Sequence, residues 1–276
     1  MQNCTFIGSG TGTRFYYVFG SLKAIQESYN INNYILTSGS GLIGTIHAVF
    51  KDKYSINKIE RILKSFDLEQ LQDRNILFPF AGTGLLEGEL IKQTLYQIFK
   101  DLKFKDIDSQ ISLILSDFTN NVEIHCSSKT TPNFAIYEAL RACISIPLIF
   151  KTDKYKLEDL NKELYLSDGM VFNNFPVNLN ENELAFGIRL VNNEVKYDIN
   201  NIFDVIMKTF DNMIRAKELE SIKDAKNVNI IEIISNENPL NFKLSYKDKE
   251  RMIESGYNQT KEYLKNLKIL CNKTKQ

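Results

Sequence analysis

Short apolar runs alternate along the chain with longer segments in which apolar residues recur every three or four positions. The first pattern is typical of buried strands and the second of amphipathic helices. We expect strands over Thr5–Ile7, Tyr34–Thr37, Ile111–Leu115, Tyr165–Leu166, Leu184–Leu190 and Val228–Ile234. We expect helices over Tyr16–Tyr29, Leu42–Phe50, Ile56–Phe66, Leu90–Phe99, Phe134–Cys143, Ile202–Lys223 and Lys247–Leu267. This alternation predicts an α/β fold in which helices cover both faces of one sheet.

Composition narrows the class of protein. The 276 residues contain 43% hydrophobic and 25% charged residues, which is typical of a globular protein, and no linker or repeat divides them. We therefore expect a single domain over residues 1–276. The formal net charge is zero, which argues against a nucleic-acid partner. Two histidines and four scattered cysteines favour free thiols and argue against a metal site.

The chain begins without the basic and apolar regions of a signal peptide. No stretch approaches the roughly 20 apolar residues that a bilayer span requires. The sequence therefore predicts a soluble, cytoplasmic protein whose membrane contact is peripheral.

A glycine-rich stretch, GSGTGTR, lies between the first strand and the first helix, where backbone amides can bind an anion. A dinucleotide fingerprint would need glycine where Phe15 stands, and a phosphate loop would need a glycine-lysine pair that is absent. An oxyanion hole requires only a few correctly aimed amides. A simple tight turn is also compatible with these residues.

A second stretch, ILTSGSGLIG, places serines between a strand and a helix, which is the setting of a nucleophile elbow. An elbow favours small residues two before and two after its serine. Ser38 has Ser40 after it but Leu36 before it, whereas Ser40 has Ser38 before it but Leu42 after it. A helix cap built from glycine and serine is an alternative interpretation.

A third stretch, LSDGMVFNNFP, contains Asp168 and Gly169 directly after a short strand. Asp-Gly is a common turn, but a carboxylate at a strand end can also reach a serine at the end of another strand. His47 lies within an apolar helix and His125 lies near a strand, and neither has a carboxylate at a suggestive spacing.

Taken in order, these stretches resemble the patatin-like phospholipases. The family has a glycine-rich loop before a YxxGxLKAL helix, and this chain has GTGTRFYYVFGSLKAI. Further similarities are GLLEGELIKQTL to GLLDGxxL, EALRACISIPLIF to AxRASxSIPxxF, and SDGMVFNNFPV to the DGGxxNNxP block. FKLSYKDKERMIESGYNQTKEYL is similar to the closing helix of the family. The resemblance covers nearly the whole chain, and within it we expect Arg141 to be structural.

The resemblance implies a three-layer α/β/α fold with a mostly parallel central sheet. It implies a Ser-Asp dyad in which Ser38 is the nucleophile and Asp168 the general base, with Ser40 and Gly169 as supporting residues. It also implies an oxyanion loop at Gly10, Gly12, Thr13 and Arg14. We choose Ser38 over Ser40 because TSGSGLIG then aligns without a gap and because related cytosolic phospholipases carry a serine two positions later. The implied substrate is a phospholipid or another lipid ester, with no metal or organic cofactor.

Four positions depart from the family pattern. Leu36 replaces the first elbow glycine, Phe15 the last glycine of the loop, Thr11 a middle glycine, and Met170 the glycine or alanine after Asp-Gly. A catalytically weak or inactive lipid- or protein-binding module is therefore one alternative function. A general esterase that uses a Ser-His-Asp triad on small esters is another.

Membrane contact by a neutral chain has to use apolar side chains. We expect the irregular stretch Phe78–Leu86 to provide them through Phe78 and Phe80, unless these rings belong to the core.

Overall fold

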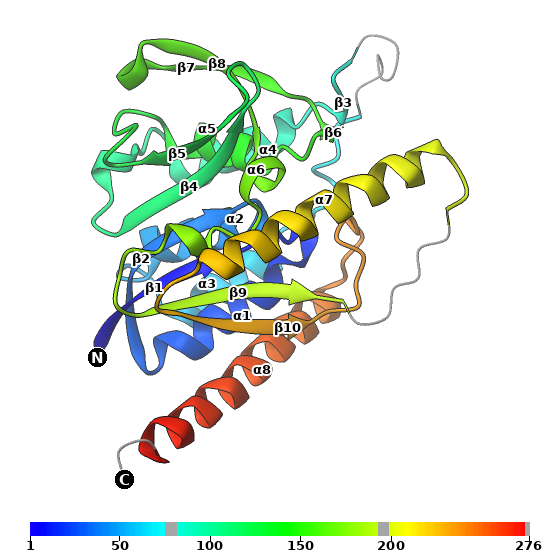
Figure 1. Cartoon of the computed structure of the whole chain (residues 1–276). Coiled ribbons are helices and arrows are strands. Elements are labelled where there is room, and N and C mark those ends of the chain that lie inside the picture. Colours follow the sequence, from blue (N-terminus) through cyan, green and yellow to red (C-terminus); the bar gives the residue numbers. More distant parts are fainter. Residues whose placement is uncertain (75–81, 193–198, 274–276) are drawn as a thin grey trace.

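The computed structural model describes residues 1–74, 82–192 and 199–273 (Figure 1). Within them, one sheet carries eight strands in the order β10-β9-β1-β2-β4-β8-β7, and β5 also pairs with β4. The pairings from β10 to β4 are parallel, and those of β4 with β5, β4 with β8 and β8 with β7 are antiparallel. The strands are β1 (Gln2–Gly8), β2 (Tyr29–Thr37), β4 (Gln110–Asp117), β5 (Val122–Ser127), β7 (Asp153–Leu157), β8 (Lys162–Asp168), β9 (Ala185–Val191) and β10 (Val228–Ile234).

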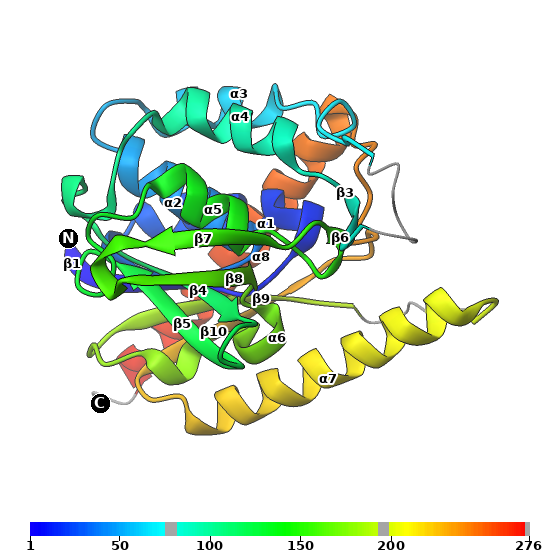
Figure 2. The ribbon, with the colours of Figure 1, turned by 90° about the horizontal axis from the view of Figure 1, so that it is seen from above.

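Helices cover both faces of this sheet, as expected. Figure 2 shows α7 on one side of the sheet, and α1, α2 and α5 on the other, with α3 and α4 further out. The helices are α1 (Phe15–Gln26), α2 (Gly39–Phe50), α3 (Ile56–Lys64), α4 (Glu89–Phe99), α5 (Ile136–Cys143), α6 (Met170–Asn173), α7 (Ile202–Asp224) and α8 (Tyr246–Lys273). A small separate sheet pairs β3 (Gly84–Leu86) with β6 (Leu148–Phe150). The predicted three-layer α/β/α fold with a mostly parallel sheet is confirmed.

Two apolar cores follow from the alternation of side chains along the strands. Phe6, Leu36 and Leu113 belong to the larger core, which they share with residues of α1, α2, α5 and α8. Their neighbours in sequence, among them Ile7 and Ile114, belong to a smaller core on the side of α7. Successive residues of a strand point to opposite faces, so buried strands need apolar residues at every position. This is why the central strands could be recognised as continuous apolar runs.

Several predicted boundaries were wrong, and some strands were missed. The helix predicted over Tyr16–Tyr29 ends at Gln26, and β2 begins at Tyr29 rather than at Tyr34. The first half of β2 is polar and partly exposed, so it lacks an apolar signal. β7 was missed because its sequence, DKYKL, buries only alternate side chains at the edge of the sheet.

α8 packs directly against α1 through two glycines. A Cβ atom on Gly20 would lie 2.0 Å from the carbonyl oxygen of Ile253, and one on Gly256 would lie 2.1 Å from that of Tyr17. The two helix backbones therefore approach more closely than any side chain would allow.

Among the described residues, Cys4, Cys126 and Cys143 are free and buried. No helix in this part of the chain combines the length and the apolar character needed to cross a bilayer. Phe78 and Phe80, expected to contact membranes, lie outside the described residues.

Candidate active site

The strand register brings Ser38 and Asp168 together. Ile114 of β4 pairs with Thr37, the last residue of β2. The next residue, Leu115, pairs with Asp168, the last residue of β8, which runs in the opposite direction. The ends of β2 and β8 therefore meet on the same stretch of β4. Ser38 Oγ donates a hydrogen bond of 2.6 Å to Asp168 Oδ2.

Ser38 occupies a strained backbone conformation between β2 and α2. Its φ of 56° and ψ of −132° are unusual for a residue other than glycine. Such strain is typical of a nucleophile elbow, in which the serine protrudes from a sharp turn between strand and helix. The conformation at Ser38 fits this interpretation, whereas a simple helix cap would need neither the strain nor the bond to Asp168.

Asp168 is fully buried, and burial raises its pKa to about 7. The hydrogen bonds from Ser38 and from the Met170 amide oppose this shift. A carboxylate that titrates near neutral pH is a stronger base than an ordinary aspartate and is still ionised in part at pH 7.

The glycine-rich loop is fixed from three sides. Ser40 Oγ donates a hydrogen bond of 2.5 Å to the carbonyl oxygen of Ser9. The Gly10 amide donates to the carbonyl oxygen of Asn174 at 2.9 Å, and the amide and hydroxyl of Thr13 both donate to that of Pro239, at 2.8 and 3.1 Å. Ser40 thus supports the loop and points away from Asp168.

These bonds occupy some of the amides predicted as oxyanion donors. The amides of Gly10 and Thr13 have other acceptors in this conformation, and the Arg14 amide donates to Thr11 at 3.2 Å. Over the described residues, the Gly12 amide has no acceptor, and neither does that of Gly39, which opens α2. Gly12 and Gly39 are therefore the available donors. Gly39 was not predicted, although the amide after the nucleophile serves this purpose in other hydrolases.

Arg14 acts on the loop through its side chain. Its Nε donates to the carbonyl oxygen of Thr11 at 3.3 Å, and its Nη1 donates to Ser235 Oγ at 3.2 Å. The guanidinium thus connects the loop to the segment that follows β10.

Three of the departures from the family pattern can be placed in the structure. The Leu36 side chain fills the space above Gly44, where a Cβ atom would lie 2.5 Å from Leu36 Cδ1. Phe15 begins α1 and lines the pocket described below. Met170 contacts Asp168 through its backbone amide, at 2.9 Å, so its side chain is not needed for that bond.

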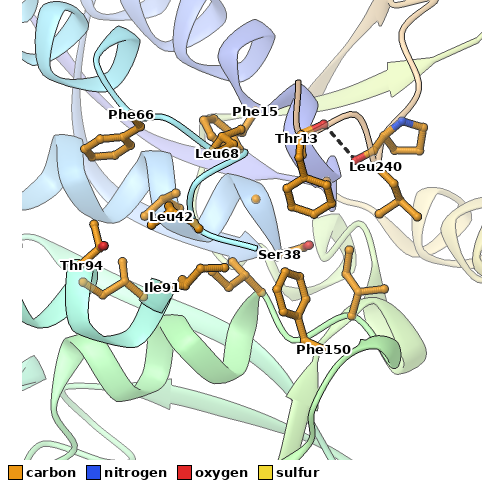
Figure 3. Close-up of a pocket in the computed structure, with 18 of the residues that line it drawn as sticks. Thr13, Phe15, Ser38, Leu42, Phe66, Leu68, Ile91, Thr94, Phe150 and Leu240 are labelled. Carbon is orange, nitrogen blue, oxygen red and sulfur yellow. Dashed lines mark hydrogen bonds between the residues drawn. The ribbon is translucent and has the colours of Figure 1, made fainter. Parts of the chain in front are cut away.

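An apolar pocket lies beside Ser38 (Figure 3). Its walls come from the glycine-rich loop, α2, the segment after α3, α4, β6 and the segment after β10. Ser38 itself is 2% exposed and is one of the residues that line the pocket. The lining includes Phe15, Leu42, Phe66, Leu68, Ile91, Leu95, Ile98, Phe150, Leu240 and Phe242. This lining fits a hydrocarbon chain.

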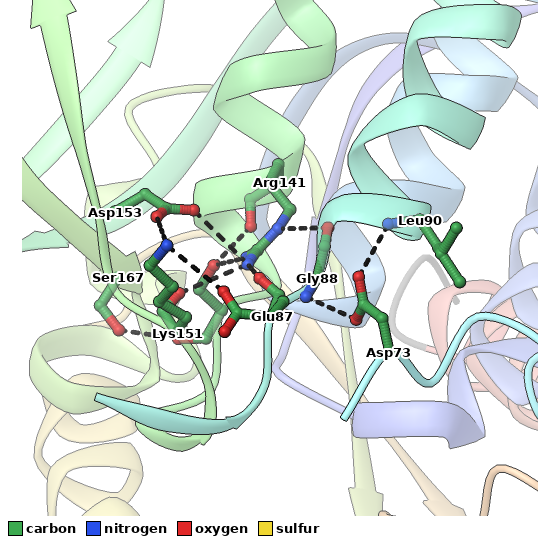
Figure 4. A network of polar contacts seen from close by, with 9 residues as sticks. Asp73, Glu87, Gly88, Leu90, Arg141, Lys151, Asp153 and Ser167 are labelled. Carbon is green, nitrogen blue, oxygen red and sulfur yellow. Dashed lines mark hydrogen bonds and ion pairs between the residues drawn. The ribbon is translucent and has the colours of Figure 1, made fainter. Parts of the chain in front are cut away.

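Arg141 ties the pocket wall to the strand of Asp168 (Figure 4). The buried guanidinium donates to the carbonyl oxygens of Gly88 at 2.9 Å and Glu87 at 2.7 Å, and it also contacts Ser145 Oγ. The Ser145 carbonyl oxygen accepts the Asp168 amide at 3.1 Å. Arg141 therefore has the structural role that was expected of it.

Neither histidine contacts Ser38 or Asp168 in the part of the chain that the structure describes. His47 is buried between Tyr34 Oη and Gln26 Oε1, each 2.8 Å from a ring nitrogen, and burial lowers its pKa to about 3. His125 lies on β5 and pairs with Glu123. Both histidines are thus engaged elsewhere.

The family to which the chain belongs identifies the class of protein as an ester-bond hydrolase. Residues 8–180 match the family model described as patatin-like phospholipase, and the chain belongs to this family.

The chain is also similar to two viral proteins and, in its fold, to a solved structure. An uncharacterized protein of Acanthamoeba polyphaga mimivirus is 24% identical over 283 aligned positions, covering 93% of this chain and 92% of that protein. A probable lipid hydrolase of Invertebrate iridescent virus 6 is 26% identical over 187 aligned positions, which cover 63% of this chain and 62% of the viral protein. The crystal structure of VipD from Legionella pneumophila shares the fold, with a TM-score of 0.57 at 13% identity over 96% of this chain and 67% of VipD.

Proposed function

We propose that the protein is a serine-dependent lipid acyl hydrolase of the phospholipase A type, which cleaves acyl esters of glycerophospholipids with a Ser38–Asp168 dyad. The observation that carries this proposal is the 2.6 Å hydrogen bond between Ser38 Oγ and Asp168 Oδ2 beside an apolar pocket.

In this mechanism, the Asp168 carboxylate takes the proton of Ser38 Oγ as that oxygen attacks the ester carbonyl. The amides of Gly12 and Gly39 stabilise the oxyanion, an effect commonly worth about 3 kcal/mol per donor. Protonated Asp168 then gives its proton to the leaving alcohol. In the second half of the cycle, Asp168 takes a proton from the water that attacks the acyl-enzyme, and it returns this proton to Ser38 Oγ as the fatty acid leaves. Each step uses only groups of this chain, the substrate and water.

The pocket supports an acyl chain as the group next to the scissile ester. Its lining is almost entirely aliphatic and aromatic, and Thr94 is one of its few polar residues. A lipid substrate also places the enzyme at a membrane surface for part of its cycle, so the proposal includes peripheral membrane contact.

The test compares two serines that lie two positions apart. We expect Ser38→Ala to abolish hydrolysis of both a phospholipid and a short soluble ester, together with labelling by a fluorophosphonate probe. Ser40→Ala removes only the bond to Ser9, so it should lower activity but leave it measurable. The reverse pattern would move the nucleophile to Ser40. Wild-type protein that reacts with neither ester nor probe would instead favour a binding module.

A further inference from the structure

The first half of α7 exposes an apolar stripe. Ile202, Val205, Ile206 and Met213 are all exposed, and Ile202 and Met213 are 74% and 59% accessible. At 100° per residue these positions fall on one side of the helix over three turns, a length of roughly 17 Å. Large apolar side chains gathered on one exposed face are informative, whereas single ones are common on protein surfaces.

The charged residues of the same half lie outside the stripe. In helical projection Asp204 and Asp211 are about half a turn from the centre of the stripe, and Lys208 is about a third of a turn from it. The stripe is therefore exposed and carries no charged side chain. Two acidic residues and one basic residue give this half no excess of positive charge.

The polar side of α7 reaches the glycine-rich loop. Glu218 Oε1 accepts a hydrogen bond of 2.5 Å from Asn174 Nδ2, and the Asn174 carbonyl oxygen holds the Gly10 amide. Burial raises the pKa of Asp211, and the charges of Lys208 and Arg14 oppose this shift. The stripe thus belongs to a helix that is connected, through Glu218 and Asn174, to the loop beside Ser38.

The stripe also lies on the side of the molecule where the pocket is built. Figures 1 and 2 both place the beginning of α7 beyond the sheet, on the side where β9 ends and where β3 and β6 lie. Phe150 of β6 lines the pocket, and Leu85 of β3 is another exposed apolar residue.

We propose that the apolar stripe Ile202–Val205–Ile206–Met213 of α7 docks the enzyme on a lipid surface, with the helix lying in the interface. This inference rests on the proposed lipid hydrolase function, which requires the pocket to meet lipid molecules at a membrane. The stripe is uncharged, and the five acidic and four basic residues of α7 give it no basic excess for anionic headgroups. Docking is therefore hydrophobic, works on zwitterionic lipid and is insensitive to salt.

The test uses phosphatidylcholine vesicles and three proteins. The double variant Ile202→Gln/Met213→Gln changes the two most exposed side chains of the stripe, and glutamine is a good helix former, so the fold should persist. The matched control is Leu219→Gln, which changes a side chain of similar exposure (49%) on the same helix outside the stripe. Each protein is measured for vesicle sedimentation at low and high salt, for hydrolysis of vesicle lipid and of a short soluble ester, and for oligomeric state.

We expect the double variant to bind vesicles at least about tenfold more weakly, which corresponds to about 1.4 kcal/mol. Its hydrolysis of vesicle lipid should fall with binding, while hydrolysis of the soluble ester and all properties of the control stay near wild type. Wild-type binding by the double variant would overturn the inference, as would binding that high salt abolishes. If wild type is a dimer and the double variant is a monomer, the stripe would instead bind a second copy of the chain. If no ester is hydrolysed but vesicles are still bound through the stripe, the proposed function fails and the docking surface stands.

Discussion

Asp168 is a buried carboxyl group that receives hydrogen bonds from the Ser38 hydroxyl and the Met170 amide. Burial raises its pKa to about 7. As a general base it must be ionised, so hydrolysis should increase as the pH rises through about 7. The same shift affects stability with the opposite sign. Between the ordinary pKa of 3.8 and about 7, the folded protein holds a proton that the unfolded chain releases, so stability falls as the pH rises through this range.

The variant Asp168→Asn separates these two effects. Asparagine has the size of aspartate but is not a base, so hydrolysis should fall by roughly 10²–10⁴-fold. Because the variant buries no charge, it should not lose stability over that pH range. The free energy of unfolding of the variant, relative to that of wild type, should increase from pH 4 to pH 8. The total increase should approach about 4 kcal/mol, which corresponds to a shift of roughly three pKa units. Thermal melting at several pH values measures the change in stability, and an ester hydrolysis assay measures the loss of activity.

The control is Asp117→Asn, which changes an aspartate whose side chain accepts hydrogen bonds from Thr119 and Asn120 in the turn after β4. It should retain activity. Near-normal hydrolysis by folded Asp168→Asn would exclude the dyad, and a constant stability difference across the pH range would show that Asp168 has an ordinary pKa.

The sequence predicted the two residues that the structure brings into contact, because each lies in a short local pattern at the end of a strand. It could not predict which loop amides remain available. That depends on Asn174 and Pro239, which are distant in sequence and occupy Gly10 and Thr13 as acceptors. Gly39 could have been inferred from its place after Ser38, and Asn174 from the paired asparagines of NNFP. The catalytic roles of all these residues remain predictions.

At the scale of the elements, the contact between α1 and α8 predicts that a glycine-to-alanine substitution in a helix will lower stability, the opposite of its usual effect. Replacing a glycine inside a helix with alanine normally stabilises it by about 1 kcal/mol. At Gly256 the new Cβ atom would lie 2.1 Å from the Tyr17 carbonyl oxygen, so the helices would have to separate. We expect Gly256→Ala to destabilise the protein by about 1–3 kcal/mol, the usual cost of overpacking. Chemical denaturation measures the change.

The matched control is Asn258→Ala, at an exposed position two residues further along the same helix. Alanine is the better helix former, so this variant should be as stable as wild type or slightly more stable. Equal stabilisation by both substitutions would show that α1 and α8 are not in close backbone contact.

The sequence predicted this helix well but not its partner. The apolar spacing over Lys247–Leu267 lies inside α8, because the helix buries one continuous side. Contact between Gly20 and Gly256 joins positions far apart in the chain, and a glycine in a helix gives no local sign of what it faces. The edge strand β7 and the polar start of β2 were missed for a related reason, since partly exposed strands lack a continuous apolar run.

At the scale of the whole molecule, the family match covers less of the chain than the single domain that we predict over residues 1–276. The match ends at residue 180, but β1 pairs with β9, and α1 packs on α8, both of which come later in the chain. A fragment of residues 1–180 would leave one side of β1 without a partner and one face of α1 uncovered. We expect this fragment to lack a cooperative thermal transition and to be rapidly proteolysed, whereas residues 1–276 should melt in one transition. Cooperative melting of the fragment would contradict the single-domain assignment.

The low exposure of Ser38 has a kinetic consequence that can be tested. Ser38 is 2% exposed, Pro239, Leu240 and Phe242 are part of the pocket lining beside it, and Pro239 is bonded to the glycine-rich loop through Thr13. We expect these three side chains to act as a cover that a reagent has to displace, so that the rate of opening limits the maximal reaction rate of every reagent. Raising the concentration of a fast inhibitor beyond a certain point would then no longer speed its reaction, and chemically different inhibitors would converge on the same maximal rate. A slow substrate would not meet this ceiling, because the cover would open and close many times before each turnover.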